Sequence, residues 1–180
     1  KRIITHISNR RTVKRIADVI EIFCRIQKEM PAKLLMVGEG PEKEMAEEMC
    51  IAKGIEDKVL FLGNSNEIDK ILCFSDLFLL PSEKESFGLA ALEAMACGVP
   101  VISSNAGGLT EVNVQGVSGF LSAVGAVDEM SDNAIAILKD PETLAKYKNQ
   151  AKEEALKFDT KNIVPLYEAV YENALRVVSY

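Results

Sequence analysis

The sequence is poor in the residues from which metal and redox sites are built. Its 180 residues include a single histidine and four cysteines, and no two cysteines are closely spaced. This excludes the paired-cysteine patterns of zinc sites and of thiol–disulfide exchange. Cys24, Cys50, Cys73 and Cys97 each lie in an apolar stretch, so we expect small buried hydrophobic residues in a reducing cytoplasm. His6 ends an apolar run, a position more typical of a packed residue than of a catalyst.

The chain also lacks an excess of positive charge and any long apolar span. Its formal net charge of −6 argues against nucleic acid or an anionic membrane surface as a main partner, because phosphate groups attract clustered lysine and arginine. No stretch reads as a membrane span or a signal peptide. The length fits a single domain. Because the chain begins with Lys1, directly before an apolar run, we expect a fragment of something longer.

Short apolar runs alternate with amphipathic stretches along the chain. This alternation predicts an α/β fold in which helices cover both faces of a parallel sheet, a Rossmann-like arrangement of three layers. Such sheets bind ligands beyond the carboxyl ends of their strands. The predicted strands are 3–7, 33–37, 58–62, 76–80, 99–102 and 116–121. The predicted helices are 13–30, 41–53, 67–74, 87–97 and 109–113, with further helices after 127, from 140 and from 159 towards 180.

The stretch from Glu85 to Glu93 is the most informative. The predicted helix 87–97 is apolar nearly all round, so we expect it to be buried, with Glu93 as its only charge. A buried carboxylate needs compensation, either by a protein hydrogen bond or by sugar hydroxyls, and the spacing alone leaves both open. Helical rise would separate the two carboxylates by roughly 12 Å. Gly88, near the helix start, lets an anion approach the free backbone amides.

This stretch resembles the E-x7-E signature of retaining GT-B glycosyltransferases of family 4, matched from Glu85 through Ile102. The resemblance implies the C-terminal, nucleotide-sugar-binding half of a two-domain enzyme. It further implies that Glu85 holds the donor hexose, that Glu93 holds the ribose hydroxyls, and that backbone amides at 87–89 take the distal phosphate. Further similar segments are 37–41, 59–63, 106–108 and 116–120.

The loop after the first predicted strand adds detail and one departure. The family has an arginine and, five residues later, a lysine, which grip the diphosphate. Lys14 matches the lysine, whereas Asn9 stands at the arginine position and supplies no charge. Compensation by Arg10 or Arg11 stays open. With Asn9 and Lys14, the segment resembles the N-acetylglucosaminyl malate synthases of bacillithiol biosynthesis, which implies transfer of N-acetylglucosamine from UDP-N-acetylglucosamine to L-malate.

The implied mechanism needs no metal and no cofactor. No Asp-x-Asp pair is present to bridge a metal to a diphosphate, so positive charge and the helix dipole must stabilise the leaving group. The implied partners are a nucleotide sugar and a small acceptor held by the missing half, and assembly into a homo-oligomer stays open. The rival hypotheses are a sugar-nucleotide 2-epimerase and a non-catalytic nucleotide-sugar sensor. The expected donor contacts are Ser8, Asn9, Lys14, Leu62, Glu85, Ser86, Phe87, Gly88, Leu89 and Glu93, with Glu85 and Lys14 also acting in catalysis.

Overall fold

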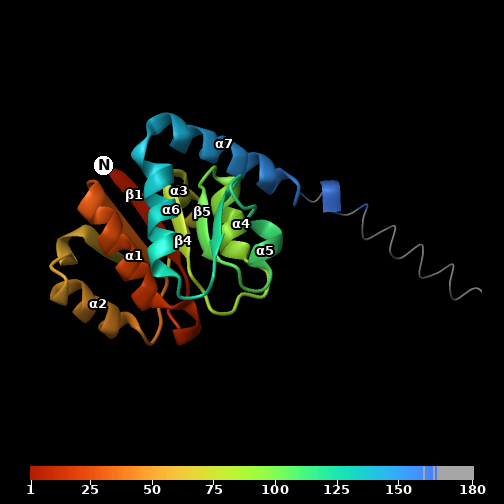
Figure 1. Ribbon diagram of the computed structural model, residues 1–180. Coiled ribbons are helices and arrows are strands. Elements are labelled where there is room, and N and C mark those ends of the chain that lie inside the picture. The colour runs from red at the N-terminus through yellow and green to blue at the C-terminus, as the bar shows by residue number, and fades with distance from the viewer. Residues whose placement is uncertain (160, 164, 166–180) are drawn as a thin grey trace, which may run out of the picture.

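The computed structural model describes residues 1–159, 161–163 and 165, and it contains a six-stranded sheet in the order β3-β2-β1-β4-β5-β6 (Figure 1). All strand pairs are parallel, as predicted. The strands are β1 (Arg2–Ile7), β2 (Ala32–Val37), β3 (Val59–Gly63), β4 (Leu77–Leu80), β5 (Val101–Ser104) and β6 (Gly119–Ser122). The α-helices are α1 (Ile16–Glu29), α2 (Lys43–Ala52), α3 (Ile68–Cys73), α4 (Leu89–Ala96), α5 (Leu109–Val112), α6 (Val127–Lys139) and α7 (Pro141–Leu156), with 3-10 turns at Thr12–Lys14 and Glu56–Lys58.

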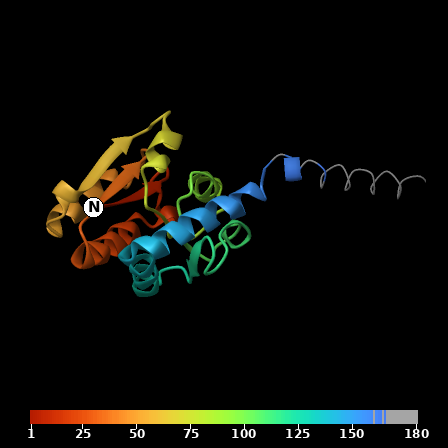
Figure 2. The same ribbon diagram turned by 90° about the horizontal axis from the view of Figure 1, so that it is seen from above.

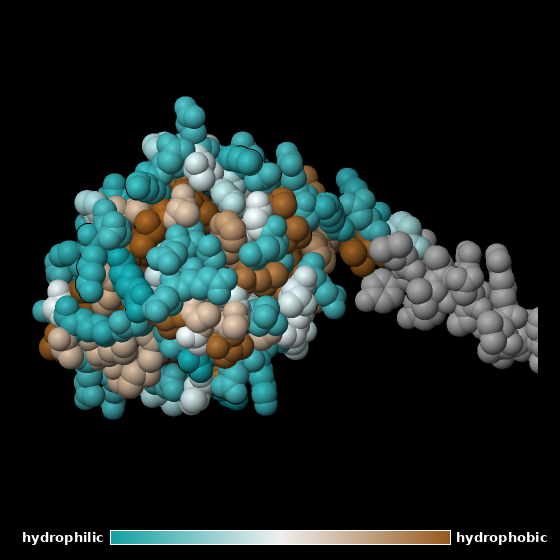
Figure 3. All heavy atoms as spheres, in the orientation of Figure 1, coloured by the Kyte–Doolittle hydropathy of each residue, from teal (hydrophilic) through white to brown (hydrophobic). Residues whose placement is uncertain are grey.

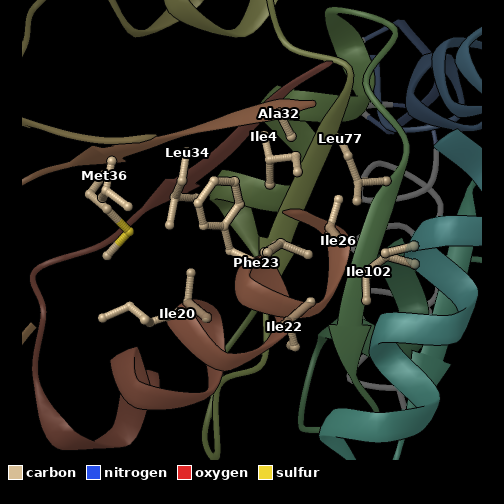
Figure 4. Close-up of a cluster of buried hydrophobic side chains, with 14 of the residues drawn as sticks. Ile4, Ile20, Ile22, Phe23, Ile26, Ala32, Leu34, Met36, Leu77 and Ile102 are labelled. Atoms are coloured by element: carbon tan, nitrogen blue, oxygen red, sulfur yellow. The ribbon is translucent and has the colours of Figure 1, made fainter. Parts of the chain in front are cut away.

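Each face of the sheet carries its own hydrophobic core. On one face α1, α2 and α6 pack on the sheet, and Phe23 of α1 lies among the aliphatic side chains of neighbouring strands (Figure 4). On the other face α3, α4, α5 and the second half of α7 form a separate cluster. Helix α6 lies beside α1, and α7 crosses from α6 to α4 (Figures 1 and 2). The predicted three-layer α/β fold is therefore confirmed.

The continuous apolar strands are explained by burial on both faces. In β4, Leu77 and Leu79 point into the first core, while Phe78 and Leu80 point into the second. Every second residue being polar would therefore bury polar side chains in one of the two cores. In α1 the buried side chains recur at helical spacing, and each contributes about 1.5–3 kcal/mol by leaving water. Within the described residues, no helix is both long and apolar enough to cross a membrane.

Several predicted boundaries are wrong: β6 begins at Gly119 and not at 116, and α2 begins at Lys43 and not at 41. Two further differences have clear local causes. Helix α1 begins at Ile16 and not at residue 13, because Arg15 adopts the left-handed conformation with φ 52° and interrupts the helix. Strand β5 begins at Val101, since Pro100 has no N–H to donate, and it continues through Ser103 and Ser104. The helix predicted from residue 159 towards 180 is described only at its start, where residues 161–163 and 165 are helical, and its remainder lies outside the described residues.

The sheet opens at the point where its strand order reverses. Strand β1 pairs with β2 along its whole length, up to Ile7 and Val37, but with β4 the pairs end at Thr5 and Phe78. The two strands therefore separate at their carboxyl ends. In open parallel sheets this reversal point forms the crevice in which ligands bind.

Candidate functional site

Two loops meet above this crevice, one after β1 and one after β4. Lys14 in the first loop and Glu85 in the second form an ion pair, with 2.6 Å between Nζ and Oε2. Their side chains are 18% and 15% exposed. The backbone N–H of Glu83 also donates to the carbonyl of Val13 at 2.8 Å, so the loops are joined by their main chains as well. The structure thus brings together the two residues that the sequence assigned to catalysis.

The amino-terminal end of α4 lies directly after the second loop. Gly88 is left-handed, with φ 89°, and the helix begins at Leu89, two residues later than predicted. The first helical bond runs from the N–H of Leu92 to the carbonyl of Gly88. The N–H groups of the preceding turn are therefore not used by the helix and are free for an anion. A side chain at Gly88 would be strained and would approach Leu109 to 2.9 Å.

The expectation that Glu93 is buried is wrong. Helix α4 buries only one side, formed by Ala91, Ala94 and Met95, while Glu93 is exposed and Leu89 is 59% exposed. Among the residues that the structure describes, no element covers the outer side of this helix, which its apolar composition did not reveal. Glu93 therefore needs no compensating protein group, and it stays available to a ligand. Since Glu85 lies in the loop, helical rise does not set the distance between the two carboxylates.

Glycines in neighbouring loops support both site loops by close backbone contact. A Cβ on Gly40 would lie 1.8 Å from the carbonyl oxygen of Asn9, and a Cβ on Gly107 would lie 1.9 Å from that of Glu85. The N–H of Gly108 donates to the same Glu85 carbonyl at 3.1 Å. Only glycine fits where backbones approach so closely. In the sequence these glycines stand out as a Gly-x-Gly after β2 and a Gly-Gly after β5, but neither pattern indicates which neighbouring loop the glycines contact.

Arg10 does not take the role of the family arginine, whose position is occupied by Asn9 in this chain. Its side chain is fully buried, donates from Nη2 to the carbonyl of Met36 at 3.1 Å, and lies over the ring of Phe61 with 5.3 Å from Cζ to the ring centroid. Burial lowers the pKa of this guanidinium. Arg11 and Asn9 are both exposed at the surface of the loop.

His6 is fully buried and has partners at both ring nitrogens. Nδ1 lies 2.8 Å from the carbonyl oxygen of Leu79, and Nε2 lies 2.6 Å from Oγ of Ser8. Burial lowers the pKa of His6 to about 4; the bond to Leu79 opposes this shift, and the charges of Lys14 and Arg10 add to it. The expectation of a packed histidine is confirmed, but its connection to the site loop was not predicted.

The remaining predicted contacts lie at the same edge of the molecule. Leu62, at the end of β3, is 41% exposed, and Ser86 is exposed beside Glu85. Phe87 is 42% exposed and meets Phe158 edge to face, with 6.1 Å between ring centroids. On the face seen in Figure 3, hydrophobic and hydrophilic residues are interspersed. In the part of the chain that the structure describes, no group of three or more histidine, cysteine, aspartate or glutamate side chains is placed to hold a metal ion.

The thiols differ from the sequence expectation. Cys50 is buried, and burial raises its pKa to about 11. Cys24 and Cys97 are only half-buried, and Cys73, at the end of α3, is exposed. The expectation of four buried cysteines is therefore wrong for Cys73.

Comparisons with known proteins agree on one family. The family described as "Glycosyl transferases group 1" matches residues 1–154. The chain is 46% identical over 177 residues to N-acetyl-alpha-D-glucosaminyl L-malate synthase of Bacillus anthracis, and 32% identical over 168 residues to an uncharacterised glycosyltransferase of Methanocaldococcus jannaschii. These matches cover 98% and 92% of this chain but 46% and 43% of the relatives. The chain thus spans about half the length of these relatives.

Solved structures share the fold. Anabaena HepE in complex with UDP and glucose matches with a TM-score of 0.80 and 26% identity, over 97% of this chain and 48% of that chain. S. aureus TarM in complex with UDP and alpha-GlcNAc-glycerol matches with a TM-score of 0.85 and 23% identity, over 100% of this chain and 36% of that chain. The C-terminal domain of a group 1 glycosyl transferase family protein of Francisella tularensis matches with a TM-score of 0.79 and 25% identity, over 88% and 86% of the two chains.

Proposed function

Because the chain belongs to the group 1 glycosyl transferase family, we propose that it is the donor-binding half of a retaining, two-domain glycosyltransferase. The donor is UDP-N-acetylglucosamine, and the acceptor is L-malate, held by the other half. The observation that carries this proposal is the Lys14–Glu85 pair, which stands at the reversal point of the sheet beside the free amides of α4. The choice of donor and acceptor is supported by the relative from Bacillus anthracis.

The chain's own groups match the parts of a nucleotide sugar. The ammonium of Lys14, the amide of Asn9 and the N–H groups at 87–89 bind the diphosphate. As the anomeric bond breaks, charge accumulates on this leaving group, and preorganised donors stabilise it more in the transition state than in the ground state. Glu85 orients the hexose through its hydroxyls. Glu93, exposed on the outer side of α4, accepts hydrogen bonds from the ribose hydroxyls.

Neither a metal ion nor an organic cofactor takes part in the proposed reaction. Lys14 supplies a fixed positive charge at the site of charge development, and the amino terminus of α4 supplies a partial one. Leu62 and Gly63, at the end of β3, contact the base.

Calorimetry of the chain with UDP, GDP and ADP tests the base, and we expect UDP to bind most tightly. The variant Lys14→Ala should lose UDP affinity by roughly one to two orders of magnitude, as expected for a lost charge-assisted contact. Arg11→Ala is the matched control, because Arg11 is an exposed cation in the same loop. Equal binding of the three nucleotides, or equal losses in both variants, would contradict the proposal.

Turnover needs the longer protein. We expect the longer protein to convert UDP-N-acetylglucosamine and L-malate to a glycoside with retained configuration. Its Lys14→Ala variant should turn over at least a hundredfold more slowly. Product analysis with and without L-malate separates transfer from epimerisation and from binding without reaction. A product formed in the absence of any acceptor would point to an isomerase instead.

A further inference from the structure

The last two residues of β1 and of β4, directly before the site loops, are no longer paired with each other. The last pair between the strands joins Thr5 and Phe78, so the next would join His6 and Leu79. At this position the imidazole of His6 contacts the Leu79 carbonyl, with 2.8 Å from Nδ1 to the oxygen. A side chain thus replaces a missing backbone hydrogen bond at the point where the sheet opens.

The direction of each hydrogen bond around His6 follows from its partners. Burial keeps the imidazole neutral, and a carbonyl oxygen can only accept, so Nδ1 carries the proton and Nε2 is the acceptor. Nε2 must then accept the hydroxyl proton of Ser8, at 2.6 Å. The Ser8 oxygen in turn accepts the backbone N–H of Arg10 at 3.2 Å. Each proton in this series of hydrogen bonds has a single position. The Ser8 hydroxyl therefore donates to His6, and its orientation is fixed.

We propose that His6 is a positioning residue for donor binding: it connects β4 to the loop from Ser8 to Arg15 and holds that loop in its binding conformation. The proposal rests on the function proposed above and adds a residue to it. His6 is fully buried, so it acts on the ligand only through Ser8 and the loop. Arg10 in this loop has a positive φ of 43°, a conformation that is costly for a residue with a side chain and that the bond to Ser8 helps to maintain.

Two single variants and their combination test this connection. Ser8→Ala removes the hydroxyl, and His6→Asn keeps a donor for the Leu79 carbonyl but is too short to reach Ser8. We expect each to weaken UDP binding by roughly five- to tenfold. The double variant should bind UDP no more weakly than either single variant, because the two substitutions break the same connection between His6 and Ser8. Ser8→Thr, which keeps a hydroxyl, should recover most of the affinity.

Thr5→Val is the matched control, because it removes another buried hydrogen bond of the same strand. Oγ of Thr5 lies 2.6 Å from Oγ of Ser75, away from the carboxyl end of the sheet. We expect this variant to lower the melting temperature with unchanged UDP affinity. Additive losses in the double variant, or an equal loss of affinity in Thr5→Val, would overturn the proposal.

A ligand-free measurement separates this proposal from the proposed function. In nuclear magnetic resonance spectra, ring nitrogen shifts should show the proton of His6 on Nδ1. The amide signals of residues 9–14 should move in the same way in Ser8→Ala and His6→Asn, but not in Thr5→Val. If the wild type bound none of the three nucleotides, the proposed function would fail while these shifts still decided the role of His6. A proton on Nε2, or an unchanged loop in both variants, would refute that role.

Discussion

The contact between Lys14 and Glu85 leads to different predictions for two related ligands. Both residues are expected to bind the donor, yet here each neutralises the other at 2.6 Å. To bind a diphosphate alone, Lys14 must give up part of this contact while Glu85 gains nothing. To bind a nucleotide sugar, Glu85 gains the sugar hydroxyls in return. The variant Glu85→Gln should therefore tighten the binding of UDP but not that of UDP-N-acetylglucosamine.

The size of the effect follows from the burial of the pair. Exposed ion pairs contribute about 0–1 kcal/mol, and hydrogen bonds to charged groups about 1.5–3 kcal/mol. With side chains 18% and 15% exposed, the pair lies between these cases, and we take about 1–2 kcal/mol. Its release corresponds to roughly five- to thirtyfold tighter UDP binding. For the nucleotide sugar this gain is offset by weaker hydrogen bonds from the hydroxyls to a neutral amide.

Calorimetric titration of wild type and variant with both ligands measures the change. Asp18→Asn is the control, because Asp18 forms an ion pair with Arg15 next to the same loop and its substitution removes the same charge. We expect little change in UDP affinity there. Weaker UDP binding in Glu85→Gln, or equal tightening in Asp18→Asn, would refute the reasoning. Unchanged UDP binding would show that Lys14 holds the diphosphate and Glu85 together, which also contradicts it.

Three further predictions concern single residues. Glu93→Gln should leave the melting temperature unchanged, because the side chain is exposed, while weakening UDP binding by about tenfold; a large loss of stability would contradict the exposed position. The pKa of His6 is lowered to about 4, so the unfolded chain takes up the proton first and the free energy of unfolding should fall by about 3 kcal/mol from about pH 6.5 to pH 4. Its single imidazole signal should titrate near pH 4, and titration near 6.5 would be inconsistent with burial. A thiol reagent should modify Cys73 in the folded chain but Cys50 only after unfolding, as peptide mass analysis would show.

The sequence predicted the layers of the fold well because its strands are buried on both faces. A run such as that of β4 has no polar position, so its burial follows from composition alone. Strand β5 was harder, since Ser103 and Ser104 are polar and yet fully buried. Ser103 accepts a hydrogen bond from Asn113 at 3.0 Å, and Ser104 donates to the carbonyl of Ser82. Such partners come from distant elements and leave no local pattern.

The outer side of α4 shows a different limit. Hydrophobic composition predicts that a helix is buried, but it does not say whether another element covers each side. In this chain α4 packs on one face of the sheet through Ala91, Ala94 and Met95, and Leu89 and Glu93 lie on the opposite, exposed side of the helix. The inference of burial from composition was therefore wrong for Glu93, while its role in donor binding stays a prediction.

The meeting of Lys14 and Glu85, 71 residues apart, depends on topology more than on either motif. Each motif by itself predicts only a loop that contains a charged residue. The strand order places the two loops beside each other at the reversal point, and the backbone bond from Glu83 to Val13 sets their distance. Gly40 and Gly107 then admit neighbouring loops so close that neither site loop can shift outward without losing contact. The charged pair is thus held in place by backbone contacts from other loops, such as the bond from Gly108 to the carbonyl of Glu85, and neither motif by itself predicts these contacts.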